Sequence, residues 1–208
     1  AVVLVVHDLM PLRQPQFCFP LVPRVFETCL REMAACSDAI VCNSHATEDD
    51  LRAWAREHGL ALAPTGHFRL GSDGLLPVAH EPVRPDLAAF LAVDTPCFVA
   101  VGTFEPKKNY PALVRAFERL WREGVPARLL IAGRETLECG TFTRALRQHP
   151  EQGHRLMTIH DANDAEVAAA YAGCRALVFP SLFEGFGLPL VEARARGSRV
   201  LASRIPPF

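Results

Sequence analysis

The second half of the chain alternates between short apolar runs and amphipathic segments, and this alternation limits the fold more than any other feature. Apolar runs typical of buried strands occupy residues 97–102, 127–133, 155–160, 175–180 and 198–203. Helical patterns lie between them, at residues 109–122, 135–148, 164–172 and 189–196. Strands that alternate with helices form an open parallel sheet with helices on both faces. We therefore predict an α/β fold with a Rossmann-like sheet here.

The first 75 residues predict the end of a second Rossmann-like domain. The run VVLVV at 2–6 is continuously apolar, as in a strand buried on both faces. A proline-rich segment follows at 10–23 and predicts a loop. A helix is expected from Arg24 to Ala35, a strand at 38–43, and a helix that Ser44 caps and that runs to Glu57.

The domain boundaries follow from a change in composition after residue 75. Residues 76–96 are rich in proline and poor in strand signals, which is typical of a linker with at most a helical turn. We therefore predict an N-terminal domain part at 1–75, a linker at 76–96 and a C-terminal domain at 97–208.

Bulk composition excludes several classes of protein. The net charge of −1 gives no electrostatic basis for binding nucleic acid. The seven cysteines are odd in number and form no CxxC pair, so we expect buried, reduced thiols in a cytoplasmic setting. No apolar run reaches the roughly 18 residues that a membrane span needs.

The stretch FEGFGLPLVE at 183–192 carries the strongest chemical signal. Glu184, Gly185 and Gly187 follow a predicted strand, and Glu192 lies in the next predicted helix. Ligands bind outside the carboxyl ends of strands in such sheets, and glycines let backbone amides approach phosphates. Two carboxylates beside these amides predict a site for a sugar or polyol phosphate. A helix-dipole role explains Glu192 alone equally well, but it leaves Glu184 unexplained.

This stretch, taken from Ser181 to Ala193, resembles the E-x7-E signature of retaining GT-B glycosyltransferases of family 4. The resemblance implies a GT-B type fold with two Rossmann-like domains. It also implies that Glu184 meets the hydroxyls of the donor sugar and that Glu192 holds the nucleotide ribose. The donor-binding loop between them comprises Gly185, Phe186, Gly187 and Leu188.

A second predicted site follows the strand that ends at Gly102. Lys107 and Lys108 precede the helix that begins near Asn109, which we expect to act as its N-cap. Lysines at a helix N-terminus oppose the helix dipole, and an anionic ligand would relieve that conflict, although solvated surface lysines are the simpler alternative. The family places phosphate-binding basic residues in this loop. Lys108 matches the family's lysine, whereas Thr103 stands where an arginine is common, so Lys107 supplies the missing charge.

The remaining candidates are weaker. His7 follows the first strand and resembles the family's histidine that faces the donor sugar across the interdomain cleft, with Asp8 orienting it. A strand-end histidine that bonds to the backbone is the alternative. Gly133, Arg134 and His160 also follow strands, and the family uses such loops for the nucleobase. Ser44 is explained by capping, and Glu48, Asp49 and Asp50 by a solvated helix face.

The resemblance implies transfer of a sugar from a nucleotide sugar to a hydroxyl acceptor, with retention at the anomeric carbon. His7, Glu184 and Lys108 are the predicted catalytic residues. No D-x-D motif indicates a divalent cation, so we expect no metal and no cofactor. The EPKKN loop resembles that of bacterial mannosyltransferases of surface-polysaccharide assembly, which favours GDP-mannose over UDP-glucose. The expected acceptor is a saccharide or a lipid-linked saccharide.

Three alternatives stay open: a nucleotide-sugar-binding remnant or subunit without turnover, a GT-B epimerase, and a phosphorylase, for which the sequence offers no pyridoxal phosphate site. The chain starts in a strand and stops before the helices that usually close the fold, so we expect a fragment. We expect it in the cytoplasm, with the inner face of the membrane as the alternative, reached through N-terminal parts outside this chain.

Overall fold

The structure is a computed structural model that describes residues 1–71, 81–136 and 139–207. The chain divides into two compact units. Unit 1 comprises Ala1–Gly71, Phe183–Leu188 and Arg204–Phe208, and unit 2 comprises Ser72–Leu182 and Pro189–Ser203. The loop that carries Glu184 therefore belongs to unit 1, although the strand before it and most of the helix after it belong to unit 2.

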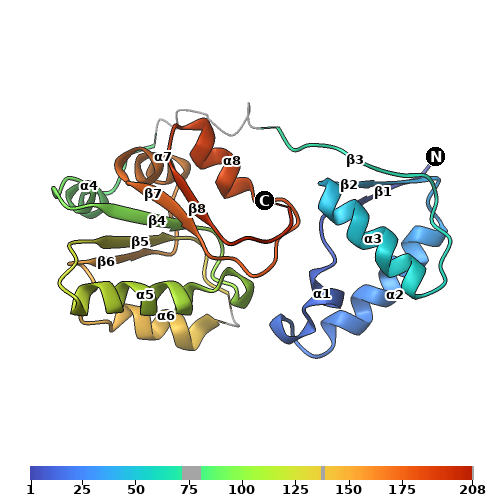
Figure 1. The fold of residues 1–208 in the computed structure, drawn as a ribbon, viewed down its shortest axis with the longest axis horizontal. Coiled ribbons are helices and arrows are strands. Elements are labelled where there is room, and N and C mark those ends of the chain that lie inside the picture. Colours follow the sequence, from blue (N-terminus) through green and yellow to red (C-terminus); the bar gives the residue numbers. More distant parts are fainter. Residues whose placement is uncertain (72–80, 137–138, 208) are drawn as a thin grey trace. The chain divides into compact units, whose positions relative to one another are not determined.

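Unit 2 is built on a parallel sheet of five strands (Figure 1). The strands are β4 (Cys97–Val101), β5 (Arg128–Ala132), β6 (Leu156–Ile159), β7 (Ala176–Phe179) and β8 (Val200–Ala202). Their spatial order is β6-β5-β4-β7-β8, and every neighbouring pair is parallel. This arrangement confirms the predicted Rossmann-like sheet.

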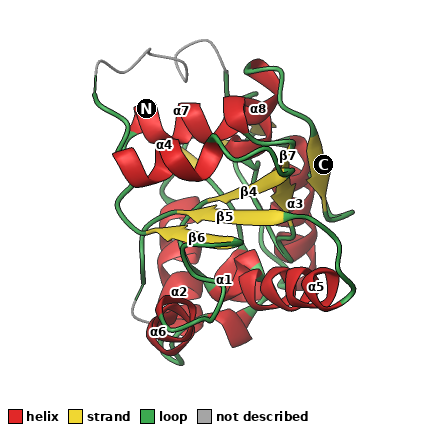
Figure 2. Cartoon of the chain, turned by 90° about the vertical axis from the view of Figure 1, so that its left-hand side faces the viewer, coloured by secondary structure: helices red, strands yellow, loops and turns green. Residues whose placement is uncertain are grey.

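Helices cover both faces of this sheet (Figure 2). One face packs against α4 (Pro85–Leu91), α7 (Asp164–Gly173) and α8 (Leu188–Ala195), and the other against α5 (Tyr110–Arg122) and α6 (Gly140–Arg147). Strand β5 shows why its sequence is continuously apolar. Leu130 and Ala132 enter the first core, while Leu129 and Ile131 enter the second. Because successive side chains of a strand point to opposite faces, both faces of β5 require apolar residues.

Two predicted segments of unit 2 differ from expectation. The helix predicted from residue 135 begins at Gly140, because Glu135 forms a parallel β-bridge with Phe104 and so stays extended. The expected linker contains a helix of seven residues, α4, whose Leu87 and Phe90 are buried in the core of unit 2. Residues 76–80 of that linker lie outside the described part of the chain. The domain boundaries stay a prediction.

Unit 1 contains a parallel sheet of three strands in the order β1-β2-β3. These are β1 (Val3–Val6), β2 (Ala39–Cys42) and β3 (Thr65–His67). Helices α2 (Val22–Ala35) and α3 (His45–Glu57) match the prediction closely. They bury Leu30, Leu51 and Trp54 against Val6 and Ile40 of the sheet. Ser44 caps α3 as predicted, since its hydroxyl accepts a hydrogen bond from the amide of Thr47 at 3.1 Å.

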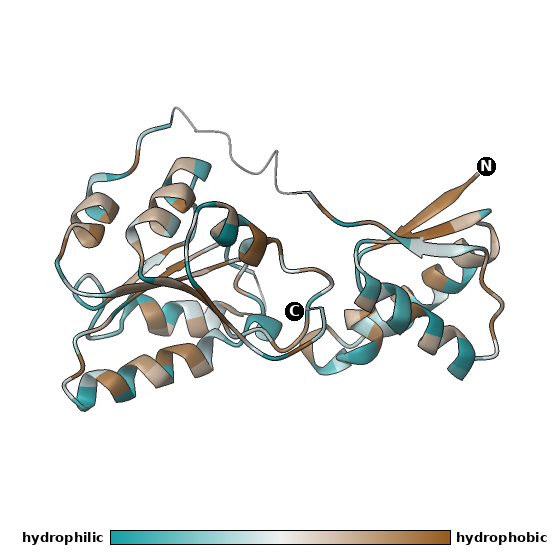
Figure 3. Ribbon diagram, turned by 45° about the horizontal axis from the view of Figure 1, so that its top comes forward, coloured by the Kyte–Doolittle hydropathy of each residue, from teal (hydrophilic) through white to brown (hydrophobic). Residues whose placement is uncertain are grey.

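Two expectations for unit 1 were wrong. Strand β1 is not buried on both faces: Val3 and Val5 are 54% and 46% exposed, whereas Val6 is buried. The helices of unit 1 pack on one face of the strand, and Figure 3 shows β1 as a strongly apolar strand. The proline-rich segment is not a continuous loop, because it forms α1 (Met10–Arg13) and the 3₁₀-helix η1 (Pro15–Phe17). Proline occupies the first turn of both, where its missing amide costs no hydrogen bond.

All seven cysteines lie among the described residues, and only Cys42 and Cys97 of them are buried, so the expectation of buried thiols was wrong for the rest.

Candidate functional site

The strand order places a topological switch point between β4 and β7. From β4 the chain continues to β5 and β6 on one side, and it returns to β7 and β8 on the other side of β4. In open α/β sheets, ligands bind at the carboxyl edge where the strand order reverses. The loops after β4 and β7 start at this edge, and both carry residues predicted from the sequence. They are joined by a hydrogen bond of 2.8 Å from the amide of Leu182 to the carbonyl of Lys107.

Lys108 is held against the first of these loops. Its side chain lies beside Gly102, where an added Cβ would come within 3.3 Å of the lysine Cε. Its ammonium nitrogen is 4.9 Å from the centroid of the Phe179 ring, which is the last residue of β7. Lys108 is only 8% exposed. A lysine with so little exposure is not a solvated surface lysine.

The turn around Lys108 depends on two unusual backbone positions. Gly102 has a φ of 141°, which other residues rarely adopt, and its carbonyl accepts a hydrogen bond of 3.0 Å from the hydroxyl of Tyr110. Asn109 lies at the N-cap of α5 (Tyr110–Arg122) as predicted, but its φ is 55° and its side chain makes no capping bond. Asparagine tolerates this left-handed conformation better than most residues. The residues 106–108 form the 3₁₀-helix η2 between these two positions.

Lys107 and Thr103 are placed differently from Lys108. The ammonium of Lys107 lies 3.4 Å from a carboxylate oxygen of Glu105, so its charge already has an acidic partner. Thr103 is half-buried in the same loop. Both residues lie with Lys108 in the loop at the carboxyl edge of the sheet, and their roles stay predictions.

Gly133 is required by the close approach of this loop. An added Cβ at Gly133 would lie 1.8 Å from the carbonyl oxygen of Gly102, which leaves no room for any side chain. The next residue, Arg134, is exposed, and its carbonyl accepts a hydrogen bond of 2.7 Å from the amide of Phe104. The loops after β4 and β5 are thus fixed to each other through their backbones.

His160 completes this group of loops. Its ring packs on the ring of Phe104 with centroids 4.9 Å apart. Both ring nitrogens are buried and have no hydrogen-bond partner among the described residues. Burial, with a smaller contribution from Arg147, lowers the pKa of His160 below its ordinary value. A neutral imidazole offers one donor and one acceptor, which suits a heterocyclic base as well as any other polar ligand.

Glu192 has a partner that the sequence did not reveal. It lies on α8, and its carboxylate accepts a hydrogen bond of 3.0 Å from the hydroxyl of Tyr171 on α7. Tyr171 is only 1% exposed, and burial together with this carboxylate raises the pKa of its phenol. No pattern in the sequence links these residues, because they lie on different helices.

The loop with Glu184 is fixed within unit 1. Gly185 is buried against the backbone of His7: an added Cβ would lie 2.0 Å from the His7 carbonyl oxygen. The carbonyl of Gly185 accepts a hydrogen bond of 2.6 Å from the hydroxyl of Ser44. The structure therefore brings together two segments that the sequence singled out independently, one with His7 and the other with Glu184.

The other residues of this loop and the neighbour of His7 have individual surroundings. Gly187 has a φ of 90°, which explains the glycine, Phe186 is half-buried and Leu188 is exposed. His7 itself is exposed. A carboxylate oxygen of Asp8 accepts a hydrogen bond of 3.0 Å from the amide of Met10, at the start of α1. The role of Asp8 in orienting His7 stays a prediction.

Two of the three acidic residues at the start of α3 are not simply solvated. The carboxylate of Glu48 binds Arg52 and His67, and that of Asp50 binds Arg13. Their side chains are 12% and 26% exposed, whereas that of Asp49 is 64% exposed. Among the described residues, no three His, Cys, Asp or Glu side chains form a group that could hold a metal ion.

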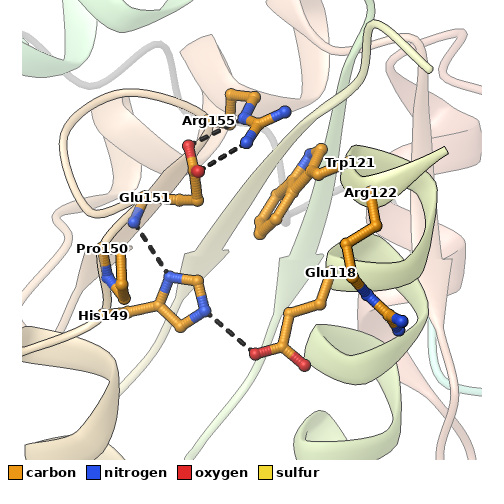
Figure 4. A pocket seen from close by; sticks show the side chains of 7 residues that line it. All are labelled: Glu118, Trp121, Arg122, His149, Pro150, Glu151 and Arg155. Atoms are coloured by element: carbon orange, nitrogen blue, oxygen red, sulfur yellow. Dashed lines mark hydrogen bonds and ion pairs between the residues drawn. The ribbon is translucent and has the colours of Figure 1, made fainter. Parts of the chain in front are cut away.

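A separate cavity of about 500 Å³ is lined by Glu118, Trp121, Arg122, His149, Pro150, Glu151 and Arg155 (Figure 4). Its lining comes from the end of α5, from residues 149–151 and from Arg155, which precedes β6. None of the predicted site residues lines it. Its polar groups bind one another: His149 contacts Glu118 at 3.1 Å, and Glu151 pairs with Arg155. Because these groups are already paired, the cavity is a weaker candidate for a site than the carboxyl edge.

Comparisons with known proteins identify the family. The family model described as "Glycosyl transferases group 1" matches residues 88–208. The chain is 35% identical over 98% of its length to the "Serotype-specific mannosyltransferase WbdA" of Escherichia coli, of which it spans 26%. The chain therefore belongs to the glycosyl transferases of group 1, and it spans about a quarter of the length of this relative.

Solved structures agree on the fold. The sucrose-phosphate synthase from Thermosynechococcus elongatus has a TM-score of 0.72, with 21% identity over 98% of this chain and 50% of that one. Anabaena HepE, solved in complex with UDP and glucose, has a TM-score of 0.69, with 18% identity over 97% of this chain and 52% of that one. These matches confirm the predicted GT-B type fold. In the described part of the chain, no helix has the length and apolar character needed to span a membrane.

Proposed function

We propose that this chain is the donor-binding part of a retaining GT-B mannosyltransferase of family 4 that uses GDP-mannose. The observation that carries the proposal is the buried Lys108 at the switch point of the sheet, beside Gly102 and the end of β7. A cation at the carboxyl edge of such a sheet, where ligands bind, suits a diphosphate. The sugar assignment rests on the mannosyltransferase relative.

In this proposal the diphosphate and the ribose bind at the carboxyl edge of the five-stranded sheet. Negative charge develops on the leaving diphosphate during transfer, and Lys108 stabilises it, with Lys107 as a second cation. Glu192 accepts hydrogen bonds from the ribose hydroxyls. Its bond with Tyr171 fixes one carboxylate oxygen and leaves the other for the ligand. Gly133, Arg134 and His160 lie at the same sheet edge and contact the base.

The sugar contacts come from the segments with His7 and Glu184, which pack together. Glu184 accepts hydrogen bonds from the mannose hydroxyls, and His7 contacts the same sugar. No described side chain is assigned as a nucleophile, so transfer on the same face of the sugar is the mechanism that we propose for retention. Electrostatic stabilisation by lysines and loop amides takes the place of a metal ion. The acceptor is a hydroxyl of a saccharide or a lipid-linked saccharide.

Isothermal titration calorimetry with GDP-mannose, UDP-glucose, GDP, UDP and guanosine tests this proposal. We expect GDP-mannose to bind most tightly and GDP to bind more tightly than both UDP and guanosine. Tighter binding of UDP-glucose than of GDP-mannose would show that the donor is not GDP-mannose. Absence of binding by all five compounds would refute it.

A further inference from the structure

We propose that the hydroxyl of Ser44 positions the donor-sugar loop Phe183–Leu188 by holding the carbonyl of Gly185, in addition to capping α3. Ser44 is in this view a positioning residue, and the effect of this position on donor binding rests on the proposed function. Capping accounts for only one of the bonds that Ser44 makes. The second, to Gly185, joins residues that are 141 positions apart in the chain and has no part in the helix.

The distances around the Ser44 hydroxyl indicate that it donates its proton to the carbonyl of Gly185. A hydroxyl has one proton and two lone pairs. The oxygen of Ser44 accepts the amide proton of Thr47 at 3.1 Å, which is the cap. Its own proton goes to the shortest bond available, 2.6 Å to the Gly185 carbonyl, rather than to the Thr47 hydroxyl at 3.0 Å.

The neighbouring hydroxyl of Thr47 plays a secondary part. It lies 3.1 Å from Oδ1 of Asn43, 3.2 Å from the Gly185 carbonyl and 3.4 Å from the His7 carbonyl. Its single proton can satisfy one of these acceptors well, and the nearest is Asn43. Ser44 is therefore the principal donor to Gly185.

The hydrogen bond between Ser44 and Gly185 is buried, so the position of the loop depends on it. Ser44 and Thr47 are 5% and 4% exposed, and Gly185 is buried. A buried carbonyl that loses its donor cannot bond to water instead, so the loop would have to move to satisfy it. The close contact between Gly185 and the His7 carbonyl leaves little freedom on the other side. Glu184 is the adjacent residue, so its position depends on the bond from Ser44.

Two substitutions at the same position separate the two roles of Ser44. Aspartate is as good an N-cap as serine, but an ionised carboxylate cannot donate a hydrogen bond to the Gly185 carbonyl. Threonine retains a hydroxyl that can cap α3 and donate. S44D therefore removes the proposed bond and keeps the cap but adds a charge beside the Gly185 carbonyl, and S44T, which adds no charge, is the matched variant that keeps the bond.

The experiment combines hydrogen exchange with calorimetry on the whole chain. In S44D we expect faster amide exchange in peptides covering 183–188, unchanged exchange in α3, and unchanged affinity for GDP. Affinity for GDP-mannose should fall about three- to tenfold, the usual effect of one hydrogen bond. S44T should restore both the exchange rate and the affinity.

The hydrogen-exchange and calorimetry measurements test the positioning role of Ser44 and the proposed function separately. Unchanged exchange at 183–188 in S44D would overturn the positioning role, whatever the ligand results. Equal loss of GDP and GDP-mannose would also overturn it, because a general structural defect would then be the cause. If the parent binds GDP-mannose no better than GDP, the sugar contacts of the proposed function fail, while the exchange arm still tests the bond to Gly185.

Discussion

The predicted site residues of the two units are held in place by different parts of their structure. In unit 2, Lys108 and Glu192 are both fixed through their side chains. The side chain of Lys108 packs beside Gly102 and the Phe179 ring, and the carboxylate of Glu192 accepts a hydrogen bond from the buried hydroxyl of Tyr171. In unit 1, the loop with Glu184 is fixed through the backbone of Gly185, which packs on His7 and accepts from Ser44. Truncation of Glu192 should therefore change binding and stability together, whereas substitution of Glu184 should change sugar binding alone.

The largest effect is expected at Lys108. K108M keeps an apolar stem of similar length beside Gly102 but removes the charge. We expect it to weaken GDP binding by about 1.5–3 kcal/mol, or about ten- to 150-fold, because a charge-assisted hydrogen bond is lost. Guanosine binding should not change, and calorimetry with both ligands measures the difference.

Lys107 provides the matched control for this prediction. Because Lys107 already pairs with Glu105, K107M should weaken GDP binding less than K108M does. Equal losses of GDP and guanosine in K108M would contradict a phosphate role for Lys108.

A smaller binding effect accompanied by a loss of stability is expected at Glu192. E192A removes the acceptor of the buried Tyr171 hydroxyl, and an unsatisfied buried group costs about 1–3 kcal/mol of unfolding free energy. GDP and GDP-mannose should both bind about ten- to a hundredfold more weakly, because the ribose is common to both. Urea unfolding and calorimetry measure the two effects.

E192Q separates the two roles of Glu192. The glutamine amide oxygen can still accept from Tyr171, so stability should return, while ribose binding stays weaker than in the parent because the charge is absent. Recovery of both properties would show that Glu192 serves the core alone.

No effect is expected from removal of divalent cations. Since lysines and amides hold the diphosphate in the proposal, EDTA should leave the affinity for GDP-mannose unchanged within error. Loss of binding in EDTA that magnesium or manganese restores would overturn the metal-independent mechanism.

Local patterns in the sequence predicted most of the fold. The sheet of unit 2 and helices α2, α3, α5, α7 and α8 follow from apolar periodicity, capping residues and glycines, which act within a few residues. The exceptions have non-local causes. Glu135 stays extended because it pairs with Phe104, and Val3 and Val5 are exposed because the helices of unit 1 pack on only one face of β1.

In the candidate site, too, local sequence patterns predicted some features, whereas others depend on contacts between distant segments. Periodicity and resemblance singled out Lys108, Glu184 and Glu192, but they could not reveal what holds them. Tyr171 and Glu192 lie on different helices, and Ser44 and Gly185 are far apart in the chain. Only the folded structure shows that Gly133 and Gly185 are glycines because another segment's carbonyl lies where a Cβ would be.

The affinity of E184A for GDP-mannose relative to GDP tests the central claim most directly. Because Glu184 is assigned to the sugar alone, calorimetry should give a loss of about 1–3 kcal/mol for GDP-mannose, or about five- to 150-fold, with GDP affinity and urea stability as in the parent. If E184A binds GDP-mannose as tightly as the parent does, Glu184 does not contact the donor sugar, and its assignment as a sugar-binding residue is wrong.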